Sequence, residues 1–128
     1  GDYFNVQMCY HDIPEHLNPF DYETFDKNPS KGYAVVTNIE TGLAEYLPMK
    51  NMHRNIDAVR ASASMPLVSR PVEINGKLYL DGGLADSIPL LHAVTDGCRK
   101  NVVVMTKETG YRRVQPKHLE LIKARYAK

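Results

Sequence analysis

An aspartate followed by two glycines is the part of this sequence whose residue types most directly suggest chemistry. Asp81, Gly82 and Gly83 come directly after an alternating run that has the pattern of a β-strand. Glycine lets a chain turn sharply and lets another group approach its backbone closely. An acid at a strand end of an open α/β sheet lies where such sheets place ligands and catalytic groups. A carboxylate there can accept a proton from a hydroxyl nucleophile, so Asp81 is a candidate general base. The ordinary alternative is a turn in which this carboxylate caps backbone amides.

The rival groups near this motif have simpler explanations. Asp86 falls where a helix is expected to begin, and an acid there is already explained by capping and by the helix dipole. The nearest hydroxyls belong to Ser62, Ser64 and Ser87, and none of them lies in a Gly-x-Ser-x-Gly elbow. We expect Ser62 and Ser64 to be small packing residues and Ser87 to be a helix cap. No substitute nucleophile is therefore expected among them.

The histidines and cysteines give no metal site by their spacing. His11 and His16 are five residues apart with a proline between them, which fits surface-loop histidines better than a ligand pair. We expect His53 to be exposed near a helix start and His92 to be a solvent-side or packing residue. His118 lies in a basic segment and gives no signal. Cys9 and Cys98 have no Cys or His at zinc-finger spacing and are expected to be free thiols.

Alternating and apolar runs predict the elements that would position Asp81. A β-hairpin is expected over 72–80, where Asn75 and Gly76 separate two alternating runs, which is the strongest short-range signal for this motif. An unbroken apolar run at 101–106 is typical of a buried strand of parallel type. The other expected elements are irregular or short helical structure over 10–31, a strand over 32–37, a turn at 40–42, a return strand over 43–47, a helix within 55–65, a helix over 89–96 closed by Gly97 and capped by Asp86 or Ser87, and a helix from Lys117 onward.

Composition bounds the class of protein. The chain has 128 residues with 16 Lys and Arg against 15 Asp and Glu, so its net charge of +1 excludes a strongly basic nucleic-acid binder. The apolar runs are too short for a membrane span, and 43% hydrophobic residues suffice for a packed core. Basic residues concentrate after Cys98, which we interpret as a solvated surface. No signal peptide is visible at the first residues, so a cytoplasmic location is expected.

The order of these motifs resembles the patatin-like phospholipase family, in its bacterial branch. The resemblance rests on an Ala-Ser-rich helix ending in Met65-Pro66, a short hairpin, and a strand closed by Asp81-Gly82-Gly83. It extends from about Asn18 to the C-terminus through the strand motif at 33–37 and the apolar run near 102–104. The resemblance implies an α/β fold, as part of a three-layer α/β/α sheet domain with hairpins, over residues 1–128.

This resemblance also implies an activity, which is hydrolysis of acyl esters by a Ser–Asp dyad without a cofactor or metal. Asp81 would be its general base, with Gly82 and Gly83 completing the motif. The chain contains neither the family's Gly-x-Ser-x-Gly nor its Gly-rich oxyanion loop. We therefore expect the chain to be the C-terminal portion of the catalytic domain and to be inactive alone. The full-length protein would act on a lipid substrate and could contact membranes peripherally. The incomplete domain is expected to self-associate.

Two other hypotheses remain beside the hydrolase. The first is a non-catalytic binding or interaction module on the same α/β scaffold, which fits the missing nucleophile equally well. The second is an aspartyl phosphotransferase built on Asp81. This would require a second aspartate close behind it, whereas Leu84 and Ala85 precede Asp86.

Overall fold

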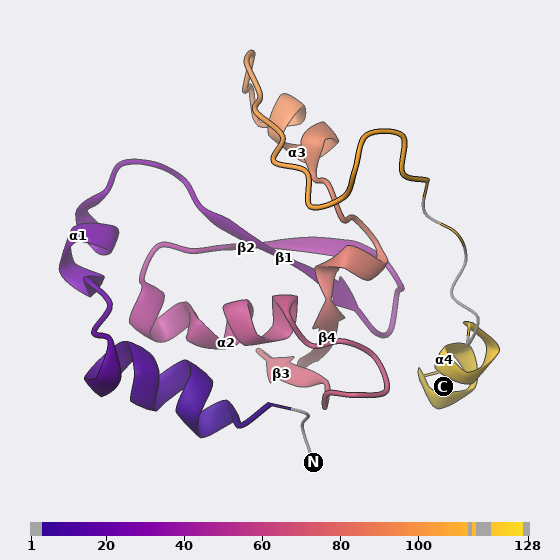
Figure 1. Ribbon diagram of the computed structural model, residues 1–128, viewed down its shortest axis with the longest axis horizontal. Helices are drawn as coiled ribbons and strands as arrows, with labels where there is room; N and C mark the ends of the chain where they lie inside the picture. Colours follow the sequence, from indigo (N-terminus) through magenta and orange to yellow (C-terminus); the bar gives the residue numbers. More distant parts are fainter. Residues whose placement is uncertain (1–3, 113, 115–118, 127–128) are drawn as a thin grey trace. The chain divides into compact units, whose positions relative to one another are not determined.

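The sheet that carries Asp81 lies in the first of two units of the chain. The computed structural model describes residues 4–112, 114 and 119–126, and the chain divides into units 1–86 and 87–128. Among these described residues, unit 1 contains four strands, the helices before and between them and a short helix after the last strand, and unit 2 contains two helices (Figure 1).

All four strands pair antiparallel in the order β2-β1-β4-β3. Val36 of the central strand β1 lies opposite Glu45 of β2 on one side and Asp81 of β4 on the other. The strands are β1 (Tyr33–Asn38), β2 (Ala44–Pro48), β3 (Val72–Ile74) and β4 (Lys77–Asp81). The expected strand, return strand and hairpin are thus confirmed to within about one residue at each end.

Local turn chemistry explains both hairpins. The side-chain oxygen of Asn38 accepts hydrogen bonds from the amides of Glu40 and Thr41, at 2.8 and 3.3 Å, and so closes the turn after β1. Asn75 and Gly76 have φ angles of 53° and 78°. Positive φ at both central residues is what a type I′ turn requires, and that turn matches the twist of the flanking strands.

Helix α2 (Met52–Ser62) packs on the sheet and forms the core with it. Asn51 caps its first turn by accepting a hydrogen bond from the amide of Arg54 at 2.9 Å. The fully buried side chains of this core come from β1, α2, β3 and β4, and they are Val36, Ala61, Val72 and Tyr79. The helix begins three residues earlier than the sequence predicts, because Asn51 provides the cap, and it ends before Pro66 as predicted.

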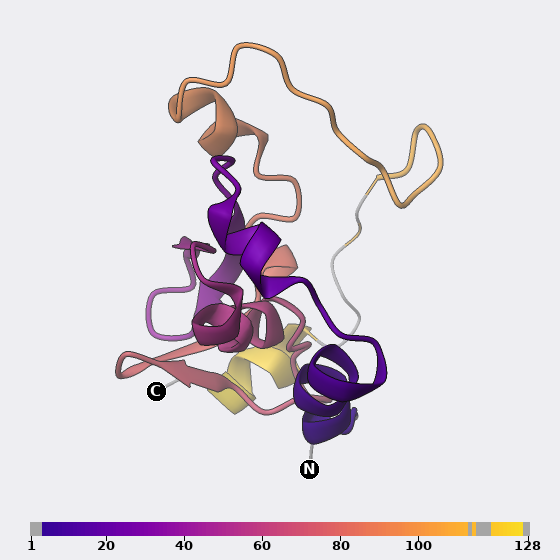
Figure 2. The ribbon, with the colours of Figure 1, turned by 90° about the vertical axis from the view of Figure 1, so that its left-hand side faces the viewer.

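The N-terminal segment forms two helices where irregular or short helical structure was expected. Helix η1 (Met8–Leu17) has the wide π-type turn, as its end shows: the amide of Asn18 bonds the carbonyl of Ile13. Helix α1 (Tyr22–Lys27) is capped by Asp21, which accepts a hydrogen bond from the amide of Thr24 and has a lowered pKa for that reason. Helix α1 lies beside α2 (Figures 1 and 2).

Unit 2 corrects two predictions. Helix α3 (Leu90–Thr95) is present, and Gly97 follows it at φ 93° as expected. Its N-cap is Pro89 without a side-chain hydrogen bond, so Asp86 and Ser87 do not cap it. Asp86 instead bonds Tyr46, and the chain turns again at Ile88 before the helix begins.

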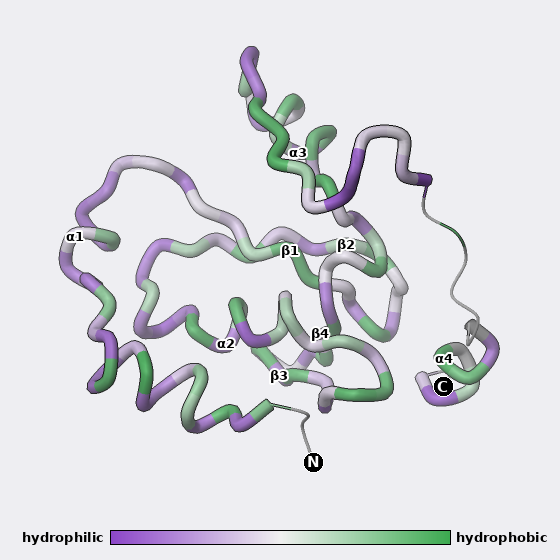
Figure 3. The backbone as a smooth tube through the Cα atoms, in the orientation of Figure 1, coloured by the Kyte–Doolittle hydropathy of each residue, from purple (hydrophilic) through white to green (hydrophobic). Residues whose placement is uncertain are grey.

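The second correction concerns the apolar run at 101–106, which is irregular chain and not a buried strand. Val102 and Val104 are 94% and 85% exposed. Figure 3 colours this run as hydrophobic where it passes α3. A strand needs a neighbour to bond its backbone, and the described part of unit 2 supplies none. The last helix, α4 (Leu119–Tyr126), agrees with the helix predicted from Lys117 onward. The first residues of that prediction lie outside the described part of the chain.

The mixed α/β class with hairpins is therefore confirmed. In unit 1 a four-stranded antiparallel sheet carries α2 on one face. This sheet ends at Asp81, so the candidate base stands at the boundary between a buried strand and a tight turn.

Candidate active site

Asp81 is the last residue of β4, and two bonds outside the strand ladder fix its backbone. Its amide donates to the carbonyl of Ser64 at 2.8 Å, just beyond the end of α2. Its carbonyl accepts a hydrogen bond from the hydroxyl Oγ1 of Thr37 in β1, also at 2.8 Å. Residues 17 and 44 positions away thus hold Asp81, which joins the end of β4 to both α2 and β1.

The carboxylate of Asp81 is partly buried and has one oxygen held in place. Oδ1 accepts a hydrogen bond from the amide of Gly83 at 2.6 Å. Within the described residues, no hydrogen bond reaches Oδ2. The capping interaction considered from the sequence is therefore real, but it uses only one carboxylate oxygen. The other oxygen remains available as a proton acceptor.

Gly82 is required by the close approach of β1. A Cβ atom at this position would lie 2.1 Å from the carbonyl oxygen and 2.4 Å from the carbonyl carbon of Val35. No real Cβ atom tolerates backbone at that distance. Gly82 begins the short 3₁₀ helix η2 (Gly82–Leu84), so the chain after Asp81 turns directly against the central strand.

Two hydroxyl groups of the sheet hold the end of this turn. Oγ1 of Thr37 also accepts a hydrogen bond from the amide of Ala85, at 3.3 Å. The hydroxyl of Tyr46 in β2 donates to Oδ2 of Asp86 at 2.6 Å. This bond raises the pKa of Tyr46, because the Asp86 carboxylate stabilises the protonated hydroxyl. Asp86, the rival of Asp81 in the sequence, is thus engaged in holding the turn.

The three candidate serines do not form a nucleophile elbow. Ser64 is 4% exposed, and its hydroxyl donates to the carbonyl of Arg60 at 2.8 Å, which closes the end of α2. Ser62 is the last residue of α2 and is partly buried. Ser87 is exposed at the start of unit 2 and does not cap α3. No strand–turn–helix elbow surrounds any of them in the described chain.

The N-terminal histidines lie on a helix and not on the loop expected for them. His11 and His16 belong to η1, and their rings lie 3.8 and 4.0 Å from the carboxylate of Glu15. His53, exposed in the first turn of α2 as expected, lies 3.7 Å from the same carboxylate. Among the described residues, no group of three or more His, Cys, Asp or Glu is arranged to hold a metal ion. His92 is a partly buried residue of α3, and His118 lies outside the described residues.

Sequence reasoning missed a polar network centred on Glu45. Its carboxylate accepts hydrogen bonds from the side-chain amide of Asn38 and the hydroxyl of Tyr79, both at 2.7 Å, and from the ammonium group of Lys77 at 3.2 Å. The Asn38 bond is the main cause of the lowered pKa of Glu45. Burial, followed by the bond to Glu45, raises the pKa of Tyr79 to about 12. The alternation of the sequence alone could have placed these side chains on one face of the sheet. It could not have predicted the strand register that brings them together.

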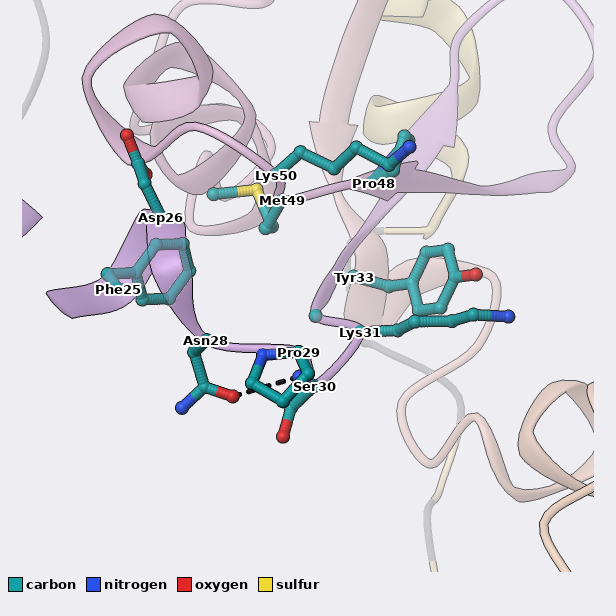
Figure 4. Close-up of a pocket in the computed structure, with 11 residues that line it drawn as sticks. Phe25, Asp26, Asn28, Pro29, Ser30, Lys31, Tyr33, Pro48, Met49 and Lys50 are labelled. Carbon is teal, nitrogen blue, oxygen red and sulfur yellow. Dashed lines mark hydrogen bonds between the residues drawn. The ribbon is translucent and has the colours of Figure 1, made fainter. Parts of the chain in front are cut away.

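A pocket of unit 1 lies at the start of β1, beside Tyr33. It measures about 720 Å³, and Figure 4 shows Phe25 on one side of it and Tyr33 on the other. Its one carboxylate, Asp26, accepts hydrogen bonds from the Asn51 side chain and the Met52 amide. Asp81 does not line this pocket. The pocket is therefore a feature of the α1–β1 connection and not part of the Asp81 site.

Both cysteines are free and exposed, as expected from their separation. None of the helices in the described part of the chain combines the length and the apolar composition needed to cross a bilayer.

Comparison with known proteins gives one family match, and it covers this site. The family model for patatin-like phospholipases matches residues 1–94, which include the whole sheet and the Asp81 turn. An uncharacterized protein of Escherichia coli K12, YjjU, is 39% identical to the chain over 62 residues. That match covers 48% of the chain and 17% of the length of YjjU. No solved structure gives a significant match to the chain.

Proposed function

The chain belongs to the patatin-like phospholipase family, and on this premise we propose that it is part of a serine hydrolase acting on acyl esters of lipids. Asp81 is the general base of a Ser–Asp dyad in this proposal, and Gly82 and Gly83 form the turn that follows it. The observation that carries the assignment is the unequal environment of the Asp81 carboxylate. The Gly83 amide holds Oδ1 at 2.6 Å, while Oδ2 accepts no hydrogen bond from the described residues.

The chemistry asked of Asp81 is proton transfer in two steps. As the serine oxygen attacks the ester carbonyl carbon, Oδ2 takes the serine proton and then passes it to the departing alcohol oxygen. A water molecule next attacks the carbonyl carbon of the acyl-serine and gives a proton to Oδ2. Oδ2 passes this proton to the departing serine oxygen, which releases the free acid and regenerates both the serine hydroxyl and the Asp81 carboxylate. The base must stay fixed throughout, and the bonds from Ser64, Thr37 and Gly83 supply that rigidity.

The chain represents the C-terminal portion of the catalytic domain in this proposal. None of its 128 residues forms a Gly-x-Ser-x-Gly elbow, so the nucleophile and the oxyanion donors belong to another part of the full-length protein. Removing such groups costs several orders of magnitude in rate, so the 128-residue chain alone is expected to be essentially inactive. The exposed apolar run at 102–105 supports this placement, since the rest of a sheet would cover it.

The proposed partners follow from the proposed substrate. A lipid ester is presented at a membrane surface, so the full-length protein would contact membranes peripherally. The 128-residue chain alone would self-associate through its exposed apolar run.

A non-catalytic binding module on the same scaffold is the alternative, and it fits the missing nucleophile equally well. Treatment with a fluorophosphonate, followed by intact-mass spectrometry, separates the two functions. The hydrolase proposal predicts one adduct on the full-length protein and none on the 128-residue chain. The absence of an adduct on the full-length protein would favour the binding module, and an adduct on the 128-residue chain would contradict the placement of the nucleophile.

A further inference from the structure

The turn that carries Asp81 is fastened to the sheet by one buried hydroxyl. Thr37 is 8% exposed and lies in the central strand β1, one position after the residue paired with Asp81. Its Oγ1 donates to the carbonyl of Asp81 at 2.8 Å and accepts from the amide of Ala85 at 3.3 Å. A single side chain thus bridges Asp81, the last residue of β4, and Ala85, the fourth residue after it.

This bridge replaces the strand ladder at the point where the ladder ends. The amide of Asp81 donates a hydrogen bond to the carbonyl of Ser64, beyond α2, and its carbonyl accepts one from the Thr37 hydroxyl. Without the Thr37 hydroxyl, the peptide between Asp81 and Gly82 would lose the hydrogen bond to its carbonyl. The Thr37 hydroxyl restrains this peptide at the Asp81 carbonyl. The Gly82 side of the turn is held by its close approach to Val35 and by the amides of Ala85 and Asp86, which bond the Gly82 carbonyl.

The orientation of the carboxylate depends on the same peptide. Oδ1 of Asp81 is held by the amide of Gly83, which is two residues further along the turn. Any rotation of the turn therefore moves the donor that holds Oδ1, and with it the direction in which Oδ2 points. A displacement of about 1 Å at a reacting group can cost about a hundredfold in rate.

We propose that Thr37 is a positioning residue for the general base, acting through the turn that it bridges. It touches neither the substrate nor the nucleophile in this role, and its contribution would appear in the chemical step. The inference rests on the proposed function of Asp81. It deepens that function by naming the group that holds the base in its productive direction.

The test compares Thr37→Val with Thr37→Ser in the full-length protein. Valine keeps the shape of threonine and removes the hydroxyl, whereas serine keeps the hydroxyl and removes the methyl group. Thr95→Val is the matched control, because the Thr95 hydroxyl donates to a carbonyl of its own helix, that of Leu91. The assay follows hydrolysis of a soluble p-nitrophenyl ester, and a fluorophosphonate counts the active sites in each preparation.

We expect Thr37→Val to lower kcat per active site by about tenfold or more, with KM changed by less than about twofold. Thr37→Ser should keep kcat within about threefold of the unaltered enzyme, and Thr95→Val should leave both constants unchanged. A Thr37→Val enzyme with unaltered kcat per active site would overturn the inference. So would a loss that serine does not restore, since that would assign the effect to packing of the methyl group.

Hydrogen exchange distinguishes a failure of this inference from a failure of the proposed function. If the unaltered full-length protein hydrolyses no ester, the proposed function fails and the catalytic part of the inference fails with it. Faster exchange of the Gly83 and Ala85 amides in Thr37→Val, but not in Thr37→Ser, would still establish the bridge. If the unaltered enzyme is active and Thr37→Val changes neither kcat nor this exchange, only the role of Thr37 is refuted.

Discussion

The backbone of Gly82 lies directly against the carbonyl group of Val35, so closely that a methyl group on Gly82 would be 2.1 Å from that oxygen. This contact places the turn after Asp81 on the central strand and not on an edge of the sheet. The neighbouring carbonyl belongs to Val35, which pairs with Tyr46 of β2 and is followed by residues paired with β4, so it cannot move aside at low cost.

Substitution of Gly82 by alanine should therefore destabilise the protein. Forcing a methyl group into a closely packed site typically costs about 1 to 3 kcal/mol in the free energy of unfolding, and more where backbone must shift. Gly32→Ala is the control, since a Cβ there would meet its nearest atom at 3.4 Å. Chemical denaturation of both variants measures the difference, and equal stability of the two would contradict the close approach.

Loss of the Tyr46 hydroxyl should loosen the far end of the same turn. Tyr46→Phe removes the 2.6 Å bond to Asp86 and leaves a partly buried carboxylate without this donor. The expected loss is about 1 kcal/mol, because hydrogen bonds to charged groups exceed neutral ones but this pair is partly solvated. Urea denaturation measures it. The variant should also lose one of the tyrosines whose pKa lies above its ordinary value, which a spectrophotometric titration near 295 nm checks.

The Glu45–Tyr79 pair predicts a specific loss of stability at alkaline pH. The pKa of Tyr79 is raised from its ordinary value of 10.0 to about 12. A raised pKa in the folded state contributes stability that is fully present below pH 10 and is lost as the pH rises towards 12. Denaturation of the protein and of Tyr79→Phe across this range should therefore give a stability difference that shrinks between pH 10 and 12. A stability difference for Tyr79→Phe that stays constant across this range would refute the prediction.

Glu45 predicts the opposite dependence at acid pH. Its pKa is lowered below the ordinary 4.5, first by the Asn38 amide and then by the Tyr79 hydroxyl. A lowered pKa contributes stability that is present above pH 4.5 and is lost as the pH falls through the folded-state pKa. Glu45→Gln removes this titration. The free energy of unfolding of Glu45→Gln, measured by urea denaturation, should therefore fall less steeply below pH 4.5 than that of the unaltered protein. An equally steep fall in both proteins would contradict the assignment.

The candidate serines of this chain should be dispensable for labelling. Ser64 uses its hydroxyl to close α2, and Ser87 is exposed without an elbow around it. We expect Ser62→Ala, Ser64→Ala and Ser87→Ala, each made in the full-length protein, to retain the fluorophosphonate adduct. Peptide mapping of the adduct gives the direct check. A label that disappears with one of these substitutions would identify that serine as the nucleophile.

The sequence predicts the strands and the hairpin because their determinants are local. Asn75 and Gly76 specify a type I′ turn by themselves, and the alternation on either side selects the inward face. The position of Asp81 at a strand end follows directly from that hairpin. The mixed α/β class is predictable for the same reason.

The features that were missed depend on contacts between distant residues. The apolar run at 101–106 has the composition of a buried strand, but composition cannot show whether a neighbouring strand is present to pair with it. Asp86 has the residue type of a helix cap, and only the folded sheet brings the Tyr46 hydroxyl to it. The hydrogen bond from Thr37 to Asp81, 44 residues apart, likewise depends on the register of β1 and β4.

The most direct test of the central claim is hydrolysis of a soluble ester by the full-length protein carrying Asp81→Asn. Asparagine keeps the shape of the side chain and can still accept the Gly83 hydrogen bond, but it cannot take a proton. Asp86→Asn is the control, as its carboxylate holds the turn through Tyr46. We predict that Asp81→Asn lowers kcat by about 10² to 10⁴-fold with an unchanged melting temperature, whereas Asp86→Asn retains most activity. Full activity of Asp81→Asn would show that this carboxylate is not the base.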